Sequence, residues 1–407
     1  MLRSMFTAVS ALRNHQTYMN VIGNNIANVN TTAFKAGRIT FQDMLSQTLR
    51  GGSAPTDTRG GINPTQLGLG MGLGGIDLMY TQGDLQPTGR TTDLAIQGDG
   101  FFVLSDGNQR VYTRDGAFDV DSSGYLISPV TGLRVQGWQA TDGTVDSSGP
   151  IGGIRIPMSQ LLSRSTTAVS PSGNLDASAA AGTTATSTLV VYDSLGVSHN
   201  ITITFTKDAA ANTWTWSAAT SDPAVSLGAN SGTLTFSGSG ILTGGAAGSI
   251  GLTFSNGAAA QTVAIDFASV TQLAQASAID LSSQNGLPPG ALNGFSISSD
   301  GVITGTYSNG LTQTIGQIAI AQFANPGGLS RLGGNAFSVS ASSGQAVIGQ
   351  PGANGRGTIS SATLEMSNVD LAQQFTNMIM AQRGFQANSR VITTSDEMLQ
   401  DLIQMKR

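Results

Sequence analysis

The sequence predicts a mainly β fold with α-helical termini. The terminal helices form a coiled-coil-like inner domain, and of two β domains the second is inserted into the first. Three observations support this prediction. Apolar residues recur at steps of three and four at both ends of the chain, which is a helical spacing. The interior consists of short alternating apolar runs separated by glycine-containing turns. Composition also changes twice within the interior, giving the order β, different β, β.

The N-terminal arm, residues 1–34, has the spacing of one helical stripe. Its apolar side chains follow the a/d pattern of a coiled coil, which Gln16 and Gly23 interrupt. The stripe comprises Leu2, Met5, Val9, Leu12, Met19 and Ile26. Four asparagines between positions 24 and 30 have side chains that compete with helical hydrogen bonding, so we expect the helix to end there.

The C-terminal arm, residues 364–407, repeats this spacing, with Gln382, Ser389 and Asp396 as polar interruptions. Its stripe comprises Leu371, Phe375, Met378, Phe385, Ile392, Leu399 and Ile403. An amphipathic helix gains most of its stability from packing, so each stripe needs a cover. The spacing alone leaves three covers open: the other arm, the β body of the same chain, or neighbouring molecules.

Residues 35–75 are predicted to form a linker or wrapping segment. Phe41, Met44, Leu45 and Leu49 allow one short further helix near its start. The rest is rich in glycine and lacks periodicity, which is typical of an extended connection.

The two β domains follow from the interior. Residues 76–147 and 286–363 are predicted to form one discontinuous β domain, with turns at positions such as Asp106-Gly107 and Asp115-Gly116. Residues 148–285 are predicted to form an inserted outer β domain, because Ile201, Ile203 and Phe205 and similar runs alternate with polar residues as in a sandwich or barrel.

Composition disfavours several classes of function. Only 11% of the residues are charged, against about 25% in ordinary soluble domains, and the formal net charge is −5. Nucleic-acid binding is disfavoured because it depends on clustered Lys and Arg. No apolar run is long enough for a membrane helix, and polar residues interrupt the N-terminus where a cleavable signal needs an apolar core. Cysteine is absent, so disulfides and thiolate sites are excluded.

We predict no catalytic residue, no cofactor and no metal site. The two histidines, His15 and His199, lie far apart in the sequence and fit ordinary structural positions. A formal G-x-G-x-x-G at residues 70–75 is not followed by a helix. The segment starting at Asp119 begins like a calcium loop, but its twelfth position is Val130 where a bidentate acid is required.

Three long motifs point to a family. The segments SALRNHQTYMNVIGNNIANVNTTAFK, TQGDLQPTGRTTDLAIQGDGFFVL and LEMSNVDLAQQFTNMIMAQRGFQANSRVITTSDEMLQDLI closely resemble bacterial flagellar rod and hook proteins. Together with YTRDGAF, GLRVQGW and FANPGGL they cover about half of the chain. The length of the chain and the segment STLVVYDSLGVSHNITITFT resemble the hook members of this family more than its shorter rod members.

The resemblance implies a structural, non-enzymatic subunit of a curved, flexible helical tube, and we predict that both apolar stripes form its polymer interface. Terminal helices would line an export channel, and the tube would transmit torque from rod to filament as a universal joint. The implied partners are other copies of the chain, the distal rod, the hook cap, the hook-filament junction protein and the type III export apparatus. The implied location is extracellular, reached without a cleaved signal peptide. Two alternatives remain: a distal rod protein with an inserted domain, and a secreted β-rich adhesin or binding module.

The same interpretation predicts where the chain moves. We expect residues 1–30 and 364–407 to be mobile in the monomer and helical in the polymer, with neighbours supplying the contacts that offset the ordering cost. Hinges are predicted at residues 147–153, 285–290 and 51–75, which connect the predicted rigid bodies.

Overall fold

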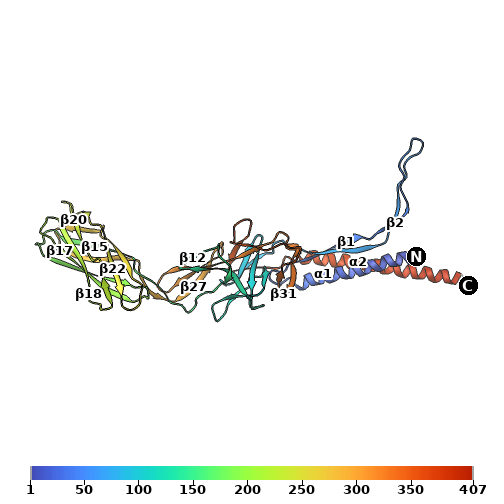
Figure 1. Ribbon diagram of the computed structural model, residues 1–407. Helices are drawn as coiled ribbons and strands as arrows, with labels where there is room; N and C mark the ends of the chain where they lie inside the picture. The colour runs from blue at the N-terminus through green and yellow to red at the C-terminus, as the bar shows by residue number, and fades with distance from the viewer. Residues whose placement is uncertain (1, 406–407) are drawn as a thin grey trace. The chain divides into compact units, whose positions relative to one another are not determined.

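The computed structural model describes residues 2–405 and divides the chain into two compact units (Figure 1). Unit 1 comprises Met1–Ile156, Ser296–Thr304 and Thr314–Arg407, and unit 2 comprises Pro157–Phe295 and Gly305–Gln313. The chain therefore passes between the units at positions other than the predicted hinges: residues 147–153 lie within unit 1 and residues 285–290 within unit 2. The domain division predicted from the sequence stays a prediction.

The predicted fold class is confirmed: the chain is mainly β, and its two terminal helices pack on each other. Helix α1 spans Leu2–Ala27 and ends among the asparagines, as expected. Helix α2 spans Leu371–Met405. Asp370 caps α2, because its Oδ1 accepts a hydrogen bond from the backbone N–H of Gln373 at 3.1 Å. Within residues 2–405 we find no helix with the length and apolar character that a membrane span requires.

The linker predicted at residues 35–75 is wrong in its local structure, because this segment forms paired strands. Strand β1 (Gly37–Asp43) pairs antiparallel with β4 (Met71–Leu78), and β2 (Ser46–Arg50) pairs with β3 (Thr65–Gly68). The short helix expected near Phe41 is absent, since that residue lies in β1. The partner of each strand lies on the other side of the glycine-rich run. The spacing of apolar residues within one strand therefore does not reveal the pairing.

Unit 1 contains a β body in which strands that precede unit 2 in the sequence pair with strands that follow it. Strand β7 pairs with β8, β11 and β30, β8 pairs with β32, β6 with β34, and β5 with β35. The strands and one 3-10 turn are β5 (Leu85–Pro87), β6 (Leu94–Gln97), β7 (Phe101–Ser105), β8 (Arg110–Thr113), β9 (Asp119–Val120), β10 (Leu126–Ile127), β11 (Arg134–Thr141), β12 (Thr144–Val145), β13 (Gly152–Gly153), β30 (Ile320–Gln322), η1 (Pro326–Gly328), β31 (Ser330–Gly333), β32 (Ala336–Ser338), β33 (Val347–Gly349), β34 (Thr358–Ser361) and β35 (Thr363–Glu365). Three further strands contain residues of both units: β27 (Leu292–Ile297), β28 (Val302–Tyr307) and β29 (Thr312–Ile318).

Unit 2 contains two sheets that share one core. One sheet has the order β16-β17-β18-β20-β21, and the other has the order β19-β22-β23-β15-β24 with β25 beside β15. Large side chains from both sheets fill the core, among them Phe205, Trp214 and Phe267. The strands are β14 (Leu162–Arg164), β15 (Ala168–Asp176), β16 (Thr184–Tyr192), β17 (Ser198–Lys207), β18 (Thr213–Thr220), β19 (Val225–Leu227), β20 (Ser231–Phe236), β21 (Leu242–Gly244), β22 (Ala247–Phe254), β23 (Gln261–Asp266), β24 (Val270–Leu273), β25 (Ala278–Gln284) and β26 (Leu287–Gly290). The alternation at Ile201, Ile203 and Phe205 does bury these side chains, as a sandwich requires.

Candidate assembly interface

The two terminal helices form an antiparallel pair with a constant register. At one end Ser4 Oγ lies 3.5 Å from Ser395 Oγ, and at the other Asn25 Nδ2 donates to Gln374 Oε1 at 3.2 Å. Between them, a Cβ added to Gly384 would come within 2.7 Å of the ring of His15. Equal steps on α1 and α2 separate these three contacts. The pair therefore runs side by side, with both chain ends at the same end of the pair (Figure 1).

The packing face of α1 lies one position before the predicted stripe. Ala8, Ala11, Ile22 and Asn25 are buried. In the predicted stripe Val9 is 38% exposed, while Met5, Leu12, Met19 and Ile26 are half-buried; the side chain of Leu2 lies outside the described residues. The a/d pattern assigned the packing face from the positions of the large apolar side chains. Apart from Ile22, the buried residues of this face are small or polar, and the large residues of the predicted stripe lie on its flank.

Helix α2 uses half of its predicted stripe. The fully buried positions are Ala381 and Ser395, which the sequence pattern did not single out. Four predicted residues lie beside them and are half-buried: Met378, Phe385, Ile392 and Leu399. The other three are exposed: Leu371 at 40%, Phe375 at 51% and Ile403 at 68%. As on α1, small side chains let the helices approach closely and leave large ones outside.

This arrangement leaves an apolar outer face on the helix pair. Exposed large apolar residues of α2 also include Ile379, Met380, Val391, Met398 and Leu402. Large contiguous exposed apolar surface is uncommon on soluble monomers and marks contact with other molecules. The narrow seam between α1 and α2 therefore covers only part of what the two stripes need to bury.

The β1–β4 ladder covers another side of α1. Asn14 Nδ2 donates to the carbonyl of Met71 at 2.7 Å, and Tyr18 packs edge-on against Phe41 with ring centroids 5.7 Å apart. Gly70, at φ +119°, lies where an added Cβ would approach Ser10 Oγ to 2.6 Å, so only glycine lets β4 come this near to the helix. Beyond the ladder, β2 and β3 are exposed along their whole length.

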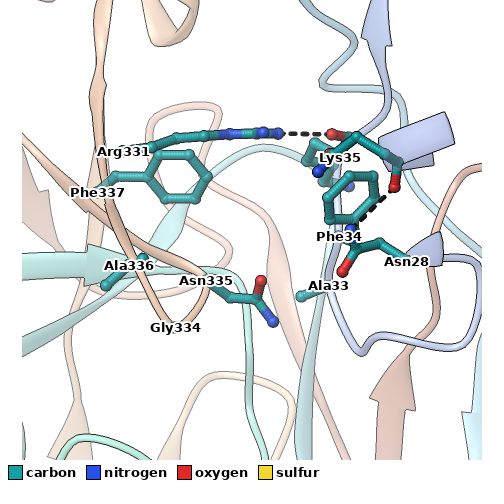
Figure 2. Close-up of a pocket in the computed structure, with 11 residues that line it drawn as sticks. Asn28, Ala33, Phe34, Lys35, Arg331, Gly334, Asn335, Ala336 and Phe337 are labelled. Carbon is teal, nitrogen blue, oxygen red and sulfur yellow. Dashed lines mark hydrogen bonds between the residues drawn. The ribbon is translucent and has the colours of Figure 1, made fainter. Parts of the chain in front are cut away.

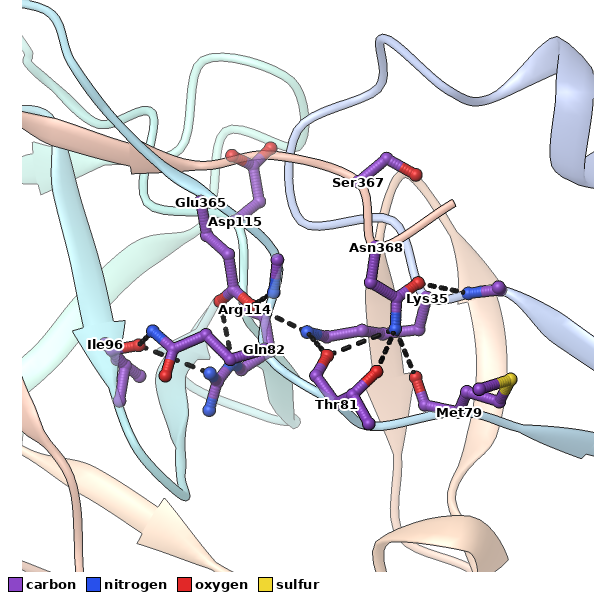
Figure 3. Close-up of polar contacts among 12 residues, drawn as sticks. Lys35, Met79, Thr81, Gln82, Ile96, Arg114, Asp115, Glu365, Ser367 and Asn368 are labelled. Atoms are coloured by element: carbon purple, nitrogen blue, oxygen red, sulfur yellow. Dashed lines mark hydrogen bonds and ion pairs between the residues drawn. The ribbon is translucent and has the colours of Figure 1, made fainter. Parts of the chain in front are cut away.

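A buried ionic cluster joins the roots of both arms to the β body of unit 1 (Figure 3). We use this name for Lys35, Arg114 and Glu365, which are at most 5% exposed. One carboxylate oxygen of Glu365 lies 2.6 Å from Lys35 Nζ, and the other accepts from Arg114 Nε at 3.0 Å. The backbone N–H of Gly83 donates to the same carboxylate at 3.0 Å.

Hydrogen bonds to backbone carbonyls complete the cluster. Arg114 donates to the carbonyls of Gly98 and Gly100 at 2.7 and 2.8 Å, and Lys35 donates to that of Thr81 at 2.8 Å. Burial opposes the charge of Glu365, but Arg114 and Lys35 outweigh it and hold the pKa of this carboxyl below its usual value. For Lys35 burial outweighs the attraction of Glu365, and its pKa is lowered. Each charged group of the cluster has ionic and hydrogen-bond partners. The cluster therefore holds together three segments that are distant in the sequence, those of Lys35, Arg114 and Glu365.

Two further side chains reinforce this junction. Asn368, just before α2, accepts from the backbone N–H of Ala36 at 2.8 Å and donates to the carbonyl of Met79 at 2.7 Å. Arg331 and Phe34 line a hollow of about 180 Å³, whose lining residues are drawn in Figure 2. The guanidinium carbon of Arg331 lies over the ring of Phe34, 5.3 Å from its centroid. Arg331 also donates to the carbonyl of Lys35 at 2.7 Å. These contacts hold the turn after α1 against the β body.

Sequence reasoning did not identify the ionic cluster or Arg331. One signal was available: in a chain with only 11% charged residues, single charges such as Lys35 and Glu365 inside otherwise uncharged motifs are candidates for paired burial. Their partners are far apart in the sequence, so the pairing itself could not be derived from spacing.

The two histidines hold structural positions. His15 lies in the helix seam, and its Nδ1 is buried. His199, in unit 2, lies between two carboxylates: Nδ1 is 2.6 Å from Asp222 Oδ2 and Nε2 is 3.3 Å from Asp193 Oδ2. Within residues 2–405 there is no group of three or more His, Asp or Glu side chains that could hold a metal ion.

Four family models match the chain in sequence order. They are "Flagella basal body rod protein" at residues 5–35, "Flagellar hook protein FlgE/F/G D1 domain" at 95–177, "Flagellar basal body protein FlaE D2 domain" at 161–287, and "Flagellar basal body rod FlgEFG protein C-terminal" at 360–405. They include both helical arms and much of both units.

Similar proteins match over the whole length. The flagellar hook protein FlgE of Borreliella burgdorferi is 40% identical over 100% of both chains, and that of Escherichia coli is 36% identical over 98% of this chain and 99% of its own. The flagellar basal-body rod protein FlgG of Bacillus subtilis is 33% identical over 100% of both. A crystal structure of Helicobacter pylori hook protein FlgE2 is similar at a TM-score of 0.45 with 16% identity, over 69% of this chain and 100% of that chain, which is too distant to bear on the argument.

Proposed function

This chain belongs to the family of bacterial flagellar hook proteins, and from that premise we propose that its terminal helix pair is the surface through which subunits assemble. Hook proteins are structural and polymerise with copies of themselves, and the chain is a structural subunit of the flagellar hook. What remains to propose is which residues meet in the polymer and how the polymer works.

One observation carries the proposal: the helix pair buries small residues in its seam and leaves large apolar residues outside. Ala381 is 1% exposed, whereas Phe375 and Ile379 nearby on α2 are 51% and 57% exposed. A surface of this kind is stabilised when a neighbour covers it. Contacts between different patches of identical subunits generate an open helical filament when the rotation does not close.

We propose that the exposed part of the predicted stripes meets neighbouring subunits. Val9, Leu371, Phe375 and Ile403 are the members with the largest exposure. The half-buried members, such as Met378 and Phe385, would contribute to both the seam and the polymer contact. In this proposal the arms order fully only on assembly, because the monomer leaves part of each stripe in water.

Strong protection of amide protons in both arms of the free monomer would contradict this ordering step. Hydrogen exchange compared between monomer and polymer measures it. Residues of unit 2 serve as the internal control, since their core is complete in one subunit.

We propose that the polymer is a curved, flexible tube that encloses the export channel and transmits torque as a universal joint. Rigid β units would slide as bodies while the tube bends. The charge-poor composition supports this, because breaking partly desolvated ion pairs on every turn is costly. We place the hinges of this proposal where the chain passes between the two units, at residues 156–157, 295–296, 304–305 and 313–314, and stiffening these connections would reduce hook bending.

We further propose that the chain is non-enzymatic, leaves the cell through the flagellar export apparatus without a cleaved signal peptide, and contacts the distal rod, the hook cap and the hook-filament junction protein. These properties are proposed from membership of the family. Pull-down assays with the full chain and each named partner test the proposed contacts.

The alternative of a distal rod protein with an inserted domain is less supported than the hook. The 33% identity with the Bacillus subtilis rod protein over the whole chain favours it, while the higher identity with hook proteins favours the hook. Electron micrographs separate the two, since hooks are curved and rods are straight. The full-length similarity to hook proteins also favours the hook over a secreted β-rich adhesin or binding module.

Removal of residues 1–30 tests the proposed interface. The variant loses α1, and with it the seam and the outer face, so we expect no hooks and no motility. Unit 2 should keep its native near-ultraviolet signal, because its core contains no residue of the arm. Normal hooks from this variant would contradict the account.

A further inference from the structure

Helix α2 continues past the start of α1. Ser395 lies level with Ser4, and α1 begins at Leu2, so residues 398–405 of α2 face no described residue of α1 (Figure 1). We call residues 398–405 the overhang. Its exposed apolar side chains are Met398, Leu402, Ile403 and Met405, at 50%, 46%, 68% and 77%, while Leu399 is half-buried. Steps of four and three place Met398, Leu402 and Met405 on one face of the helix.

An apolar groove lies beside the same helix pair, further from its end. Its volume is about 710 Å³, and we call it the groove. Helices α1 and α2 and strand β3 line it with Phe6, Leu67 and Val391, together with Leu69 just after β3. Phe6 is 73% exposed and the other three are 40–44% exposed. The groove is therefore an apolar concavity in a single subunit.

The overhang cannot occupy the groove of its own subunit. Val391 and Ile403 lie on one straight helix, about 18 Å apart at 1.5 Å of rise per residue. A second copy of the chain can bring the two surfaces together. Charge favours the same pairing: Arg3 lines the groove, and Asp401 lies on the overhang between its apolar residues.

We propose that the overhang of one subunit inserts into the groove of a neighbouring copy, with Leu402 and Met405 against Phe6 and Leu67. This inference rests on the proposed polymerisation through the terminal helices and specifies one of its contacts. Because the two surfaces differ, the contact is heterologous and gives the polymer a direction. The occupant is recognised as an apolar helical segment with an acidic residue on its face.

Leu67 gives a substitution that changes the lining of the groove. It is 44% exposed and lines the groove, so Leu67→Asp places a like charge near Asp401 of the incoming overhang. Leu49 lies on β2 of the same hairpin, is 60% exposed and is not among the groove residues, so Leu49→Asp is the matched control. We expect Leu67→Asp to raise the critical concentration for polymerisation at least tenfold and Leu49→Asp to leave it unchanged. Equal polymerisation of the two variants would overturn the proposal.

The absence of cysteine in the chain allows a direct test of proximity. A disulfide requires Cα atoms within about 7 Å, so a Phe6→Cys/Leu402→Cys variant cannot close a bond within one subunit. Oxidised polymers should give a ladder of covalent multimers on a denaturing gel. The control pairs Phe6→Cys with Ile241→Cys, at a residue of unit 2 that is 64% exposed, and should give no ladder.

The outcomes separate this contact from the broader proposal. Polymers of the Phe6→Cys/Leu402→Cys variant without a ladder would overturn the groove contact and leave assembly through the helices intact. Failure of the unaltered chain to polymerise would contradict the proposed function itself. If the first pair prevents assembly, the Leu67→Cys/Met405→Cys pair tests the same contact, and a ladder from either pair supports it.

Discussion

The helix pair of unit 1 and the sandwich of unit 2 use apolar residues in opposite ways. In unit 2, Phe205 and Trp214 are fully buried among strands of the same subunit. In the helix pair the seam buries alanine and serine, and large side chains such as Phe375 lie outside. A complete core stabilises a unit by itself, whereas an incomplete one stabilises an assembly. Unit 2 is therefore stabilised by contacts within one subunit, whereas the helix pair depends in part on contacts between subunits.

Removing a large side chain from the core of unit 2 should produce the largest loss of stability. Phe205→Ala deletes a fully buried ring that packs edge-on against Phe267 at 5.9 Å. Such substitutions cost about 3–5 kcal/mol. Hydrogen exchange of unit 2 in the monomer measures the loss, with Phe254→Ala, which is only half-buried, as a milder control. An unchanged exchange rate would show that unit 2 also depends on neighbours.

Breaking the ionic cluster is expected to loosen both arms together. Glu365→Gln leaves Lys35 and Arg114 buried without a counter-charge, and loss of one partner from a buried pair costs about 3–5 kcal/mol. Urea unfolding monitored by amide hydrogen exchange measures the loss of stability in unit 1. The stability of unit 2 should be unaffected. Glu397→Gln on the exposed face of α2 is the matched control and should change stability by less than about 0.5 kcal/mol.

His199 makes the stability of unit 2 sensitive to pH. Burial alone would lower the pKa of His199, but hydrogen bonds and charge from Asp222 and Asp193 outweigh it and raise that pKa. A raised folded pKa means that the stabilisation is fully present below the unfolded value near 6.5 and is lost as pH rises through the folded value. Above it, the neutral ring can donate to only one carboxylate.

A His199→Gln variant tests this titration. The imidazolium donates to both Asp222 and Asp193, and hydrogen bonds to charged groups contribute about 1.5–3 kcal/mol. Melting curves of unit 2 between pH 5 and pH 9 should show wild-type stability falling with pH, while the variant is lower and flatter over this range. Parallel curves for the two proteins would show that His199 does not titrate in this way.

The difference between the two regions also explains what the sequence could predict. In unit 2, alternation at Ile201 and Ile203 predicted buried faces correctly, because large apolar residues and burial coincide there. In the helix pair the same rule placed the α1 seam at Val9 where Ala8 is buried. Large apolar residues there mark an outer surface, so a rule that equates them with the seam is one position off.

Long-range partners account for the remaining errors. The β1–β4 ladder joins strands on either side of a glycine-rich run, and its residues carry no local periodicity that distinguishes them from a linker. The ionic cluster likewise joins Lys35 to Glu365 across most of the chain. Pairing energy of this kind arises only once the chain has folded, so it is invisible to spacing and propensity.

The smallest expected effect on the monomer comes from the exposed face of α2. Phe375 is 51% exposed, so Phe375→Ala should change monomer stability by no more than about 0.5 kcal/mol, as surface substitutions usually do. The same change should raise the critical concentration for polymerisation, because it removes an aromatic ring that we place between subunits. Sedimentation of polymer against free subunit measures the second effect, and urea unfolding the first. A Phe375→Ala variant that unfolds early yet polymerises normally would mean that this ring stabilises its own subunit, and the contrast between the two regions would then fail at this residue.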